Sequence, residues 1–129
     1  MIQNKVFICD DDVSIAKTLE LIFKMNDVDS IIETDSTKAF AQIMALKPAI
    51  VVVDLHMPVL SGKELIRLIR STPQLKKTFI LCISASDDGR DVALEAGANM
   101  ILPKPFDMDD IIAIVGKILT AKFPKDAVA

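Results

Sequence analysis

The chain contains no tryptophan and no tyrosine, and only one of its 129 residues is a histidine. The missing rings weaken any proposal in which a flat ligand is held by aromatic stacking. Its two cysteines, Cys9 and Cys82, lie inside apolar runs and lack the spacing of a zinc site. We therefore expect reduced thiols in a protein core.

Excess basic charge and long apolar runs are also missing. Fifteen Lys and Arg residues against 18 Asp and Glu residues give a net charge of −3, and no basic stripe is present. This balance argues against direct nucleic-acid binding. The longest apolar runs, such as 49–53 and 111–115, are far shorter than a membrane span, and no apolar segment of a secretion signal follows the first residues. We expect a cytoplasmic protein without a membrane partner.

Apolar runs of strand length alternate with helical patterns from one end of the chain to the other. The expected strands lie at 6–9, 30–32, 49–53, 78–83 and 100–102. Each is followed by a segment whose apolar residues recur as on one helical face. Strands that are apolar throughout are covered on both sides, which is typical of a parallel sheet between helices. The pattern predicts an α/β fold of five βα units.

The chain is long enough for one domain with a substantial core. We assign residues 1–121 to this domain and residues 122–129 to a tail or the start of a linker. Asp12, Ser36 and Asp107 can cap the first, second and last helix, which fixes where these helices begin. Leu65, Leu68 and Ile69 of the third helix are expected to face the core, and the fourth helix is expected to begin at Asp87 and to end before Gly97.

Ionisable or hydroxyl side chains follow four of the five expected strands. Asp10 and Asp11 follow the first strand, Asp54 the third, Ser84 the fourth and Lys104 the fifth. In an open parallel sheet, ligands bind beyond the carboxyl ends of the strands. Three carboxylates, one hydroxyl and one ammonium group are therefore expected at the same edge of the sheet.

This set of groups suits phosphoryl transfer with a hard cation. Crowded carboxylates repel one another, and Mg²⁺ relieves that repulsion while sharing its other coordination positions with water and phosphate. Mn²⁺ could take its place. Lys104 and Ser84 would each hold a phosphoryl oxygen, and Asp54 would be the nucleophile.

The chain resembles the receiver domains of two-component response regulators, such as the chemotaxis regulators. The resemblance is carried by "FICDDD", "VVVDLHMP" with Gly62 four residues after Pro58, "ISA", "AGAN" and "KPF". Any one of these segments is a weak signal, but five in the family's order and spacing are specific. The resemblance extends along almost the whole chain. It implies a flavodoxin-like, doubly wound sheet of five parallel strands in the order 2-1-3-4-5.

The resemblance also implies roles for the acidic residues. Asp54 would be the phosphoacceptor, and Asp10 and Asp11 would be the acidic pair that serves Mg²⁺. The direct metal ligands would be Asp11, Asp54 and the backbone carbonyl of His56.

Two further positions match the residues that read the phosphoryl group, namely Ser84 and Lys104. The resemblance implies a cis peptide bond between Lys104 and Pro105, which proline permits at low cost. The family commonly has an aromatic switch residue three positions before the lysine, where this chain has Ile101. That departure puts the usual aromatic switch in question.

Two alternatives compete with this interpretation. "FICDDDVS" also fits the opening of haloacid-dehalogenase-type phosphatases, with Asp10 as nucleophile and 87–91 imitating their late acidic loop. That family places its lysine before the acidic loop, whereas Lys104 follows it, and Asp54 would have no role. A pseudo-receiver that binds partners without phosphorylation is disfavoured because every phosphorylation residue is present.

We therefore expect a signalling phosphoacceptor rather than an enzyme. A histidine kinase or a histidine phosphotransfer protein would supply the phosphoryl group, and Asp54 would receive it. The phosphorylated domain would then act on an output domain or partner protein that the sequence does not identify.

Overall fold

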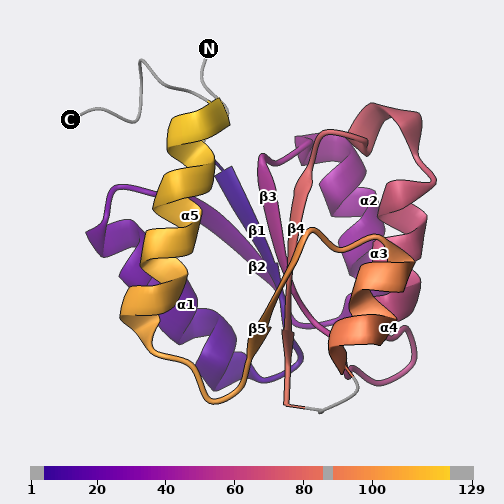
Figure 1. Cartoon of the computed structure of the whole chain (residues 1–129), viewed down its shortest axis with the longest axis horizontal. Helices are drawn as coiled ribbons and strands as arrows, with labels where there is room; N and C mark the ends of the chain where they lie inside the picture. Colours follow the sequence, from indigo (N-terminus) through magenta and orange to yellow (C-terminus); the bar gives the residue numbers. More distant parts are fainter. Residues whose placement is uncertain (1–4, 86–88, 123–129) are drawn as a thin grey trace.

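The computed structural model describes residues 5–85 and 89–122. Five parallel strands form one sheet in the order β2-β1-β3-β4-β5, with helices on both faces (Figure 1). The strands are β1 Lys5–Cys9, β2 Asp29–Glu33, β3 Ile50–Asp54, β4 Phe79–Ser84 and β5 Met100–Pro103. The helices are α1 Val13–Met25, α2 Ser36–Leu46, α3 Gly62–Arg70, α4 Gly89–Ala96 and α5 Met108–Lys122, with a short 3-10 helix at Pro73–Leu75. The predicted flavodoxin-like α/β fold and its strand order are confirmed.

Two apolar cores flank the sheet, because successive side chains of a strand point to opposite faces. In the central strand β3, Val51 and Val53 pack on the side of α2, α3 and α4. Ile50 and Val52 pack on the side of α1 and α5 (Figure 1). The whole of β3 is buried, as expected for a parallel strand covered on both faces.

The N-termini of the first two helices confirm one predicted cap and correct another. Asp12 caps α1, where its side chain accepts a hydrogen bond from the backbone of Ile15. The prediction that Ser36 caps α2 is wrong, because Asp35 takes that position and its carboxylate accepts from the backbone N–H of Thr37. Ser36 becomes the first helical residue, and its buried hydroxyl donates instead to the carbonyl of Pro58, 3.1 Å away.

The prediction that Leu68 faces the core is also wrong. Leu65, Ile66 and Ile69 are fully buried, whereas Leu68 is 40% exposed. Together with Gly62, the buried residues of α3 follow the spacing of one helical stripe, and Leu68 falls beside that stripe. Leu68 instead lines a shallow hollow on the outer surface of α3.

The end of α4 and the start of α5 follow the sequence pattern. Gly97 follows α4 with a φ of +120°, and its N–H donates to the carbonyl of Ala93. The first residue of α5 follows Asp107, whose carbonyl accepts from the N–H of Asp110. The expected start of the fourth helix at Asp87 lies outside the described residues, as do residues 123–129 of the expected tail.

Val59 gives a prediction about stability. It lies in the loop between β3 and α3 with a φ of 67°, and its side chain is 88% exposed. A left-handed backbone costs a β-branched residue about 1–2 kcal/mol, and no burial offsets that cost here. We predict that Val59→Asn raises the free energy of unfolding by about 1 kcal/mol, because asparagine tolerates this conformation. Urea denaturation measures the change.

The matched control is Val59→Thr, which keeps the branched Cβ and is expected to leave the free energy of unfolding unchanged. Equal stabilities for the asparagine and threonine variants would contradict the assignment of backbone strain to this position.

Candidate functional site

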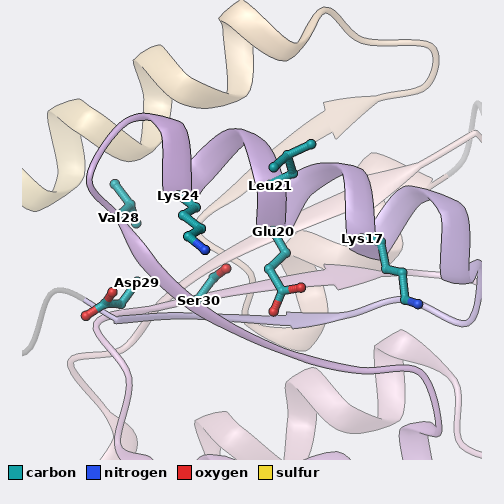
Figure 2. A pocket seen from close by; sticks show the side chains of 7 residues that line it. All are labelled: Lys17, Glu20, Leu21, Lys24, Val28, Asp29 and Ser30. Atoms are coloured by element: carbon teal, nitrogen blue, oxygen red, sulfur yellow. The ribbon is translucent and has the colours of Figure 1, made fainter.

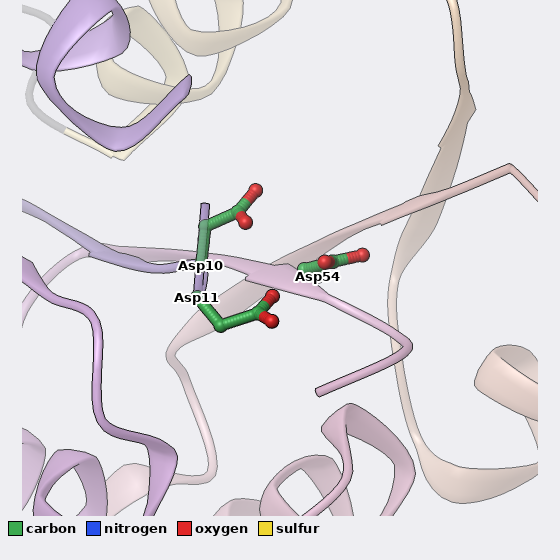
Figure 3. A group of neighbouring side chains, drawn as sticks. All are labelled: Asp10, Asp11 and Asp54. Carbon is green, nitrogen blue, oxygen red and sulfur yellow. The ribbon is translucent and has the colours of Figure 1, made fainter. Parts of the chain in front are cut away.

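Three aspartates meet at the carboxyl end of the sheet. Asp10 and Asp11 follow β1, and Asp54 ends the neighbouring strand β3 (Figure 3). Each offers a carboxylate oxygen, and these oxygens lie within 4.8 Å of one another. Asp10 and Asp54 are buried, whereas Asp11 is exposed to solvent. The cluster is therefore enclosed on one side and open on the other.

Strand pairing brings these side chains together. The register of β1 and β3 pairs Cys9 with Val53, so the next residues of the two strands, Asp10 and Asp54, leave the sheet side by side. The residues before them are apolar and fully buried. At this end of the sheet, the aspartates are thus the first residues after the apolar runs of the two strands at which a charge can reach solvent or an ion.

The carboxylate of Asp10 indicates a place for a cation. Its Oδ1 accepts a hydrogen bond from the backbone N–H of Asp12 at 2.9 Å. Its Oδ2 is buried, and none of the residues in the ranges 5–85 and 89–122 gives it a hydrogen bond. An unpaired buried carboxylate oxygen is costly, so a bound ion would remove a penalty that the side chain otherwise carries.

The electrostatics of the cluster agree with this interpretation. Burial raises the pKa of Asp10 from 3.8 to about 6; the hydrogen bond from Asp12 opposes the rise, and the charge of Asp54 adds to it. Burial also raises the pKa of Asp54, against the opposing effects of Lys104 and of the backbone N–H of His56. Crowding and desolvation therefore disfavour the charged form of both carboxylates.

Lys104 supplies the positive charge nearest to Asp54. Its Nζ lies 3.6 Å from Oδ1 of Asp54, the only ion pair found within the described part of the chain. The peptide bond between Lys104 and Pro105 is cis, as expected. The backbone N–H of Lys104 donates to the carbonyl of Ser84 at 2.9 Å. The residue after β5 is thus tied to the end of β4.

Of the other predicted site residues, Ser84 lies beside this pair. Ser84 ends β4 and is buried, one residue beyond Ile83, which pairs with Asp54. The His56 side chain is exposed to solvent. Ile101 is half-buried and packs against the core on the side of α2, α3 and α4.

The sequence did not indicate how closely Gly62 approaches the aspartate strand. A Cβ on Gly62 would lie 2.2 Å from the backbone oxygen of Asp54 and 2.7 Å from the Cα of Leu55. The N–H of Gly62 also donates to the carbonyl of Leu55 at 2.8 Å. A glycine at this position lets the start of α3 rest directly on the end of β3. The only indication of this contact in the sequence was the position of Gly62 four residues after Pro58.

A separate hollow of about 410 Å³ lies between α1 and β2 (Figure 2). It is lined by Lys17, Glu20, Leu21, Lys24, Val28, Asp29 and Ser30. Ser30 pairs with Val6, near the start of β1, whereas the aspartates lie beyond its end. The two lysines and two carboxylates of the lining balance in charge, so the hollow selects neither anions nor cations.

Comparisons with known proteins agree on one family. A family model described as the response regulator receiver domain matches residues 6–116. The response regulator MprA of Mycobacterium bovis is 30% identical over 123 residues, which are 95% of this chain and 54% of that protein. The chain thus spans about half the length of the mycobacterial relatives that it matches.

Solved structures agree with this match. The receiver domain of the Francisella response regulator 1452 has a TM-score of 0.84 at 29% identity, covering 92% of this chain and 98% of that one. The Vibrio cholerae chemotaxis protein CheY4 has a TM-score of 0.83 at 24% identity, over 91% and 99% of the two chains, a likeness that concerns the fold alone. Among the described helices, none is long and apolar enough to cross a membrane.

The aspartate cluster predicts a pH dependence of stability in metal-free solution. The pKa of Asp10 is about 6 in the folded protein against an ordinary 3.8, so the folded state holds this proton more tightly than the unfolded state. The resulting stabilisation is present below pH 3.8 and is lost as the pH rises through about 6. The loss is at most about 3 kcal/mol, and Asp10→Asn is expected to remove most of it.

Urea unfolding of both proteins in EDTA between pH 4 and 7 measures this effect. The quantity to compare is the difference between the two proteins, because carboxylates outside the aspartate cluster titrate equally in both. A difference that stays constant over this pH range would show that Asp10 does not carry the raised pKa.

Proposed function

The chain belongs to the response regulator receiver domain family, and from that premise we propose that Asp54 accepts a phosphoryl group from a phosphohistidine. Response regulators in general receive phosphate from histidine kinases, so a histidine kinase or a histidine phosphotransfer protein would be the donor. The observation that carries the proposal is the position of Asp54 within reach of two more carboxylates and 3.6 Å from the Lys104 ammonium group. The phosphorylated domain would alter its contacts with an output domain or partner protein.

The proposed transfer forms a bond between a carboxylate oxygen of Asp54 and phosphorus while the phosphorus–nitrogen bond of the donor breaks. The electron pair of that bond goes to the ring nitrogen, and the ring leaves as neutral imidazole when its other nitrogen carries a proton. The ionised carboxylate needs no base to activate it. The Lys104 ammonium group would hold one of the phosphoryl oxygens and offset its charge.

The aspartate cluster fits a hard divalent cation. It combines three carboxylates with a buried, unpaired oxygen of Asp10, and the exposed Asp11 leaves room for water ligands. We propose Mg²⁺, or Mn²⁺ in its place, with Asp11, Asp54 and the backbone carbonyl of His56 as ligands and Asp10 in support. When bound, the ion would neutralise the carboxylates and offset the charge of the phosphoryl oxygens.

The phosphatase alternative is not favoured, because the family match is to receiver domains. Asp10, its proposed nucleophile, is the most enclosed of the three aspartates. Of the acidic segment 87–91 that imitates a phosphatase loop, residues 87 and 88 lie outside the described part of the chain.

The first test of the proposal is phosphorylation by acetyl phosphate, followed by intact-mass measurement. We expect the wild-type chain to gain one phosphoryl group only when Mg²⁺ or Mn²⁺ is present, and Asp54→Ala to gain none. Asp12→Ala is the matched control. It removes a neighbouring carboxylate that caps α1, so we expect about 1 kcal/mol of lost stability but unchanged phosphorylation. A phosphorylated Asp54→Ala protein would refute the proposal.

The second test concerns the response to phosphorylation. Ser84 lies at the end of β4, where its hydroxyl would bind a phosphoryl oxygen, whereas Ile101 is a stiff, β-branched residue that would keep its rotamer. We predict that Ser84→Ala reduces the phosphorylation-driven change in amide exchange of α4 severalfold and that Ile101→Val leaves it nearly unchanged. A larger effect of Ile101→Val would indicate that the residue at 101 carries the switch after all.

A further inference from the structure

The helix nearest to Ser84 packs through small residues. The buried residues of α4 are Gly89, Ala93 and Ala96, which recur on one helical face. Its larger apolar residues are less deeply buried, since Val92 is half-buried against the core and Leu94 is 40% exposed. A helix whose fully buried positions carry only hydrogen atoms and methyl groups can lie closer to a sheet than one that buries leucine or isoleucine at those positions. The backbone of α4 therefore comes within contact of the strand ends.

The closest approach is between Gly89 and Ser84. A Cβ on Gly89 would lie 2.2 Å from the hydroxyl oxygen of Ser84 and 2.8 Å from its Cβ, with Cδ2 of Leu55 at 3.1 Å. The backbone of Gly89 has no left-handed φ that would require glycine, unlike Gly97 at +120°. The need for glycine at position 89 is therefore a need for space beside Ser84.

We propose that Gly89 is a positioning residue, because its lack of a side chain leaves the space in which the Ser84 hydroxyl packs against the first turn of α4. We call this arrangement the resting state. Because no side chain separates them, a displacement of the hydroxyl changes the packing of α4 directly. This link to phosphorylation rests on the function proposed above, in which Ser84 binds a phosphoryl oxygen. The packing role of Gly89 does not depend on it.

The same geometry predicts in which direction a substitution of Gly89 shifts the equilibrium between the resting state and the phosphoryl-bound state. A methyl group at position 89 would overlap both the Oγ and the Cβ of Ser84. Rotation of the hydroxyl removes only the overlap with Oγ, so α4 and the end of β4 must also separate. If the hydroxyl leaves its resting place to meet a phosphoryl group, part of this overlap is already relieved. Gly89→Ala therefore destabilises the resting state more than the phosphoryl-bound state, which shifts the equilibrium toward the latter.

The packing role is tested by thermal unfolding of Gly89→Ala and Gly116→Ala in metal-free buffer. Gly116 lies in α5, and no described atom comes within 4 Å of a Cβ built there. Alanine normally stabilises a helix over glycine, so we expect Gly116→Ala to raise Tm by about 2–5 °C. We expect Gly89→Ala to lower Tm, and adding Ser84→Ala to recover part of that loss. An equal rise in Tm for both glycine variants would overturn the proposal.

The link to phosphorylation is tested by the affinity for beryllium fluoride, a phosphoryl mimic, in the presence of Mg²⁺. We expect Gly89→Ala to bind the mimic about 3- to 10-fold more tightly than wild type, and Gly116→Ala to match wild type. Equal or weaker binding by Gly89→Ala would overturn the coupling. If wild type neither binds the mimic nor becomes phosphorylated, the function proposed above fails, while the comparison of Tm values still decides the packing role.

Discussion

The pairing of β1 with β3 is the constraint on which the site depends. Cys9 lies opposite Val53, and the residues that precede them, 6–8 in β1 and 50–52 in β3, are buried and apolar. A shift of register by one residue would draw Asp10 or Asp54 into the sheet and bury a carboxylate among apolar side chains, which costs far more than a lost contact. The core thus selects the register, and the register sets two carboxylates side by side.

Two glycines extend this arrangement from strands to helices. Gly62 lets α3 rest on the backbone of Asp54, and Gly89 lets α4 rest on the side chain of Ser84. The ends of β3 and β4, which carry Asp54 and Ser84, therefore contact helix backbone rather than side chains that could yield by rotation. Close-packed contacts of this kind transmit small displacements, because there is little free volume in which they could be absorbed.

The sequence predicted what depends on pattern and topology. Apolar runs located all five strands, and the rule that ligands bind beyond strand ends was enough to select the three aspartates. Prediction failed where neighbouring residues have similar chemistry, as with Asp35 and Ser36, since both can cap a helix. The prediction for Leu68 was wrong because α3 has more apolar residues than its single buried stripe can hold. The contact between Gly89 and Ser84 leaves no pattern in the sequence, because it depends on the distance between α4 and the end of β4.

The strand order also determines which strands could pair with the sheet of another copy of the domain. β2 and β5 form the open edges of the sheet, where unpaired backbone groups could recruit a strand from another chain. β2 begins at Asp29 and ends at Glu33, so an identical strand pairing in register would set like charges opposite each other. β5 is only four residues long and ends at Pro103, which has no N–H to donate. Both edges thus resist edge-to-edge aggregation without a covering element.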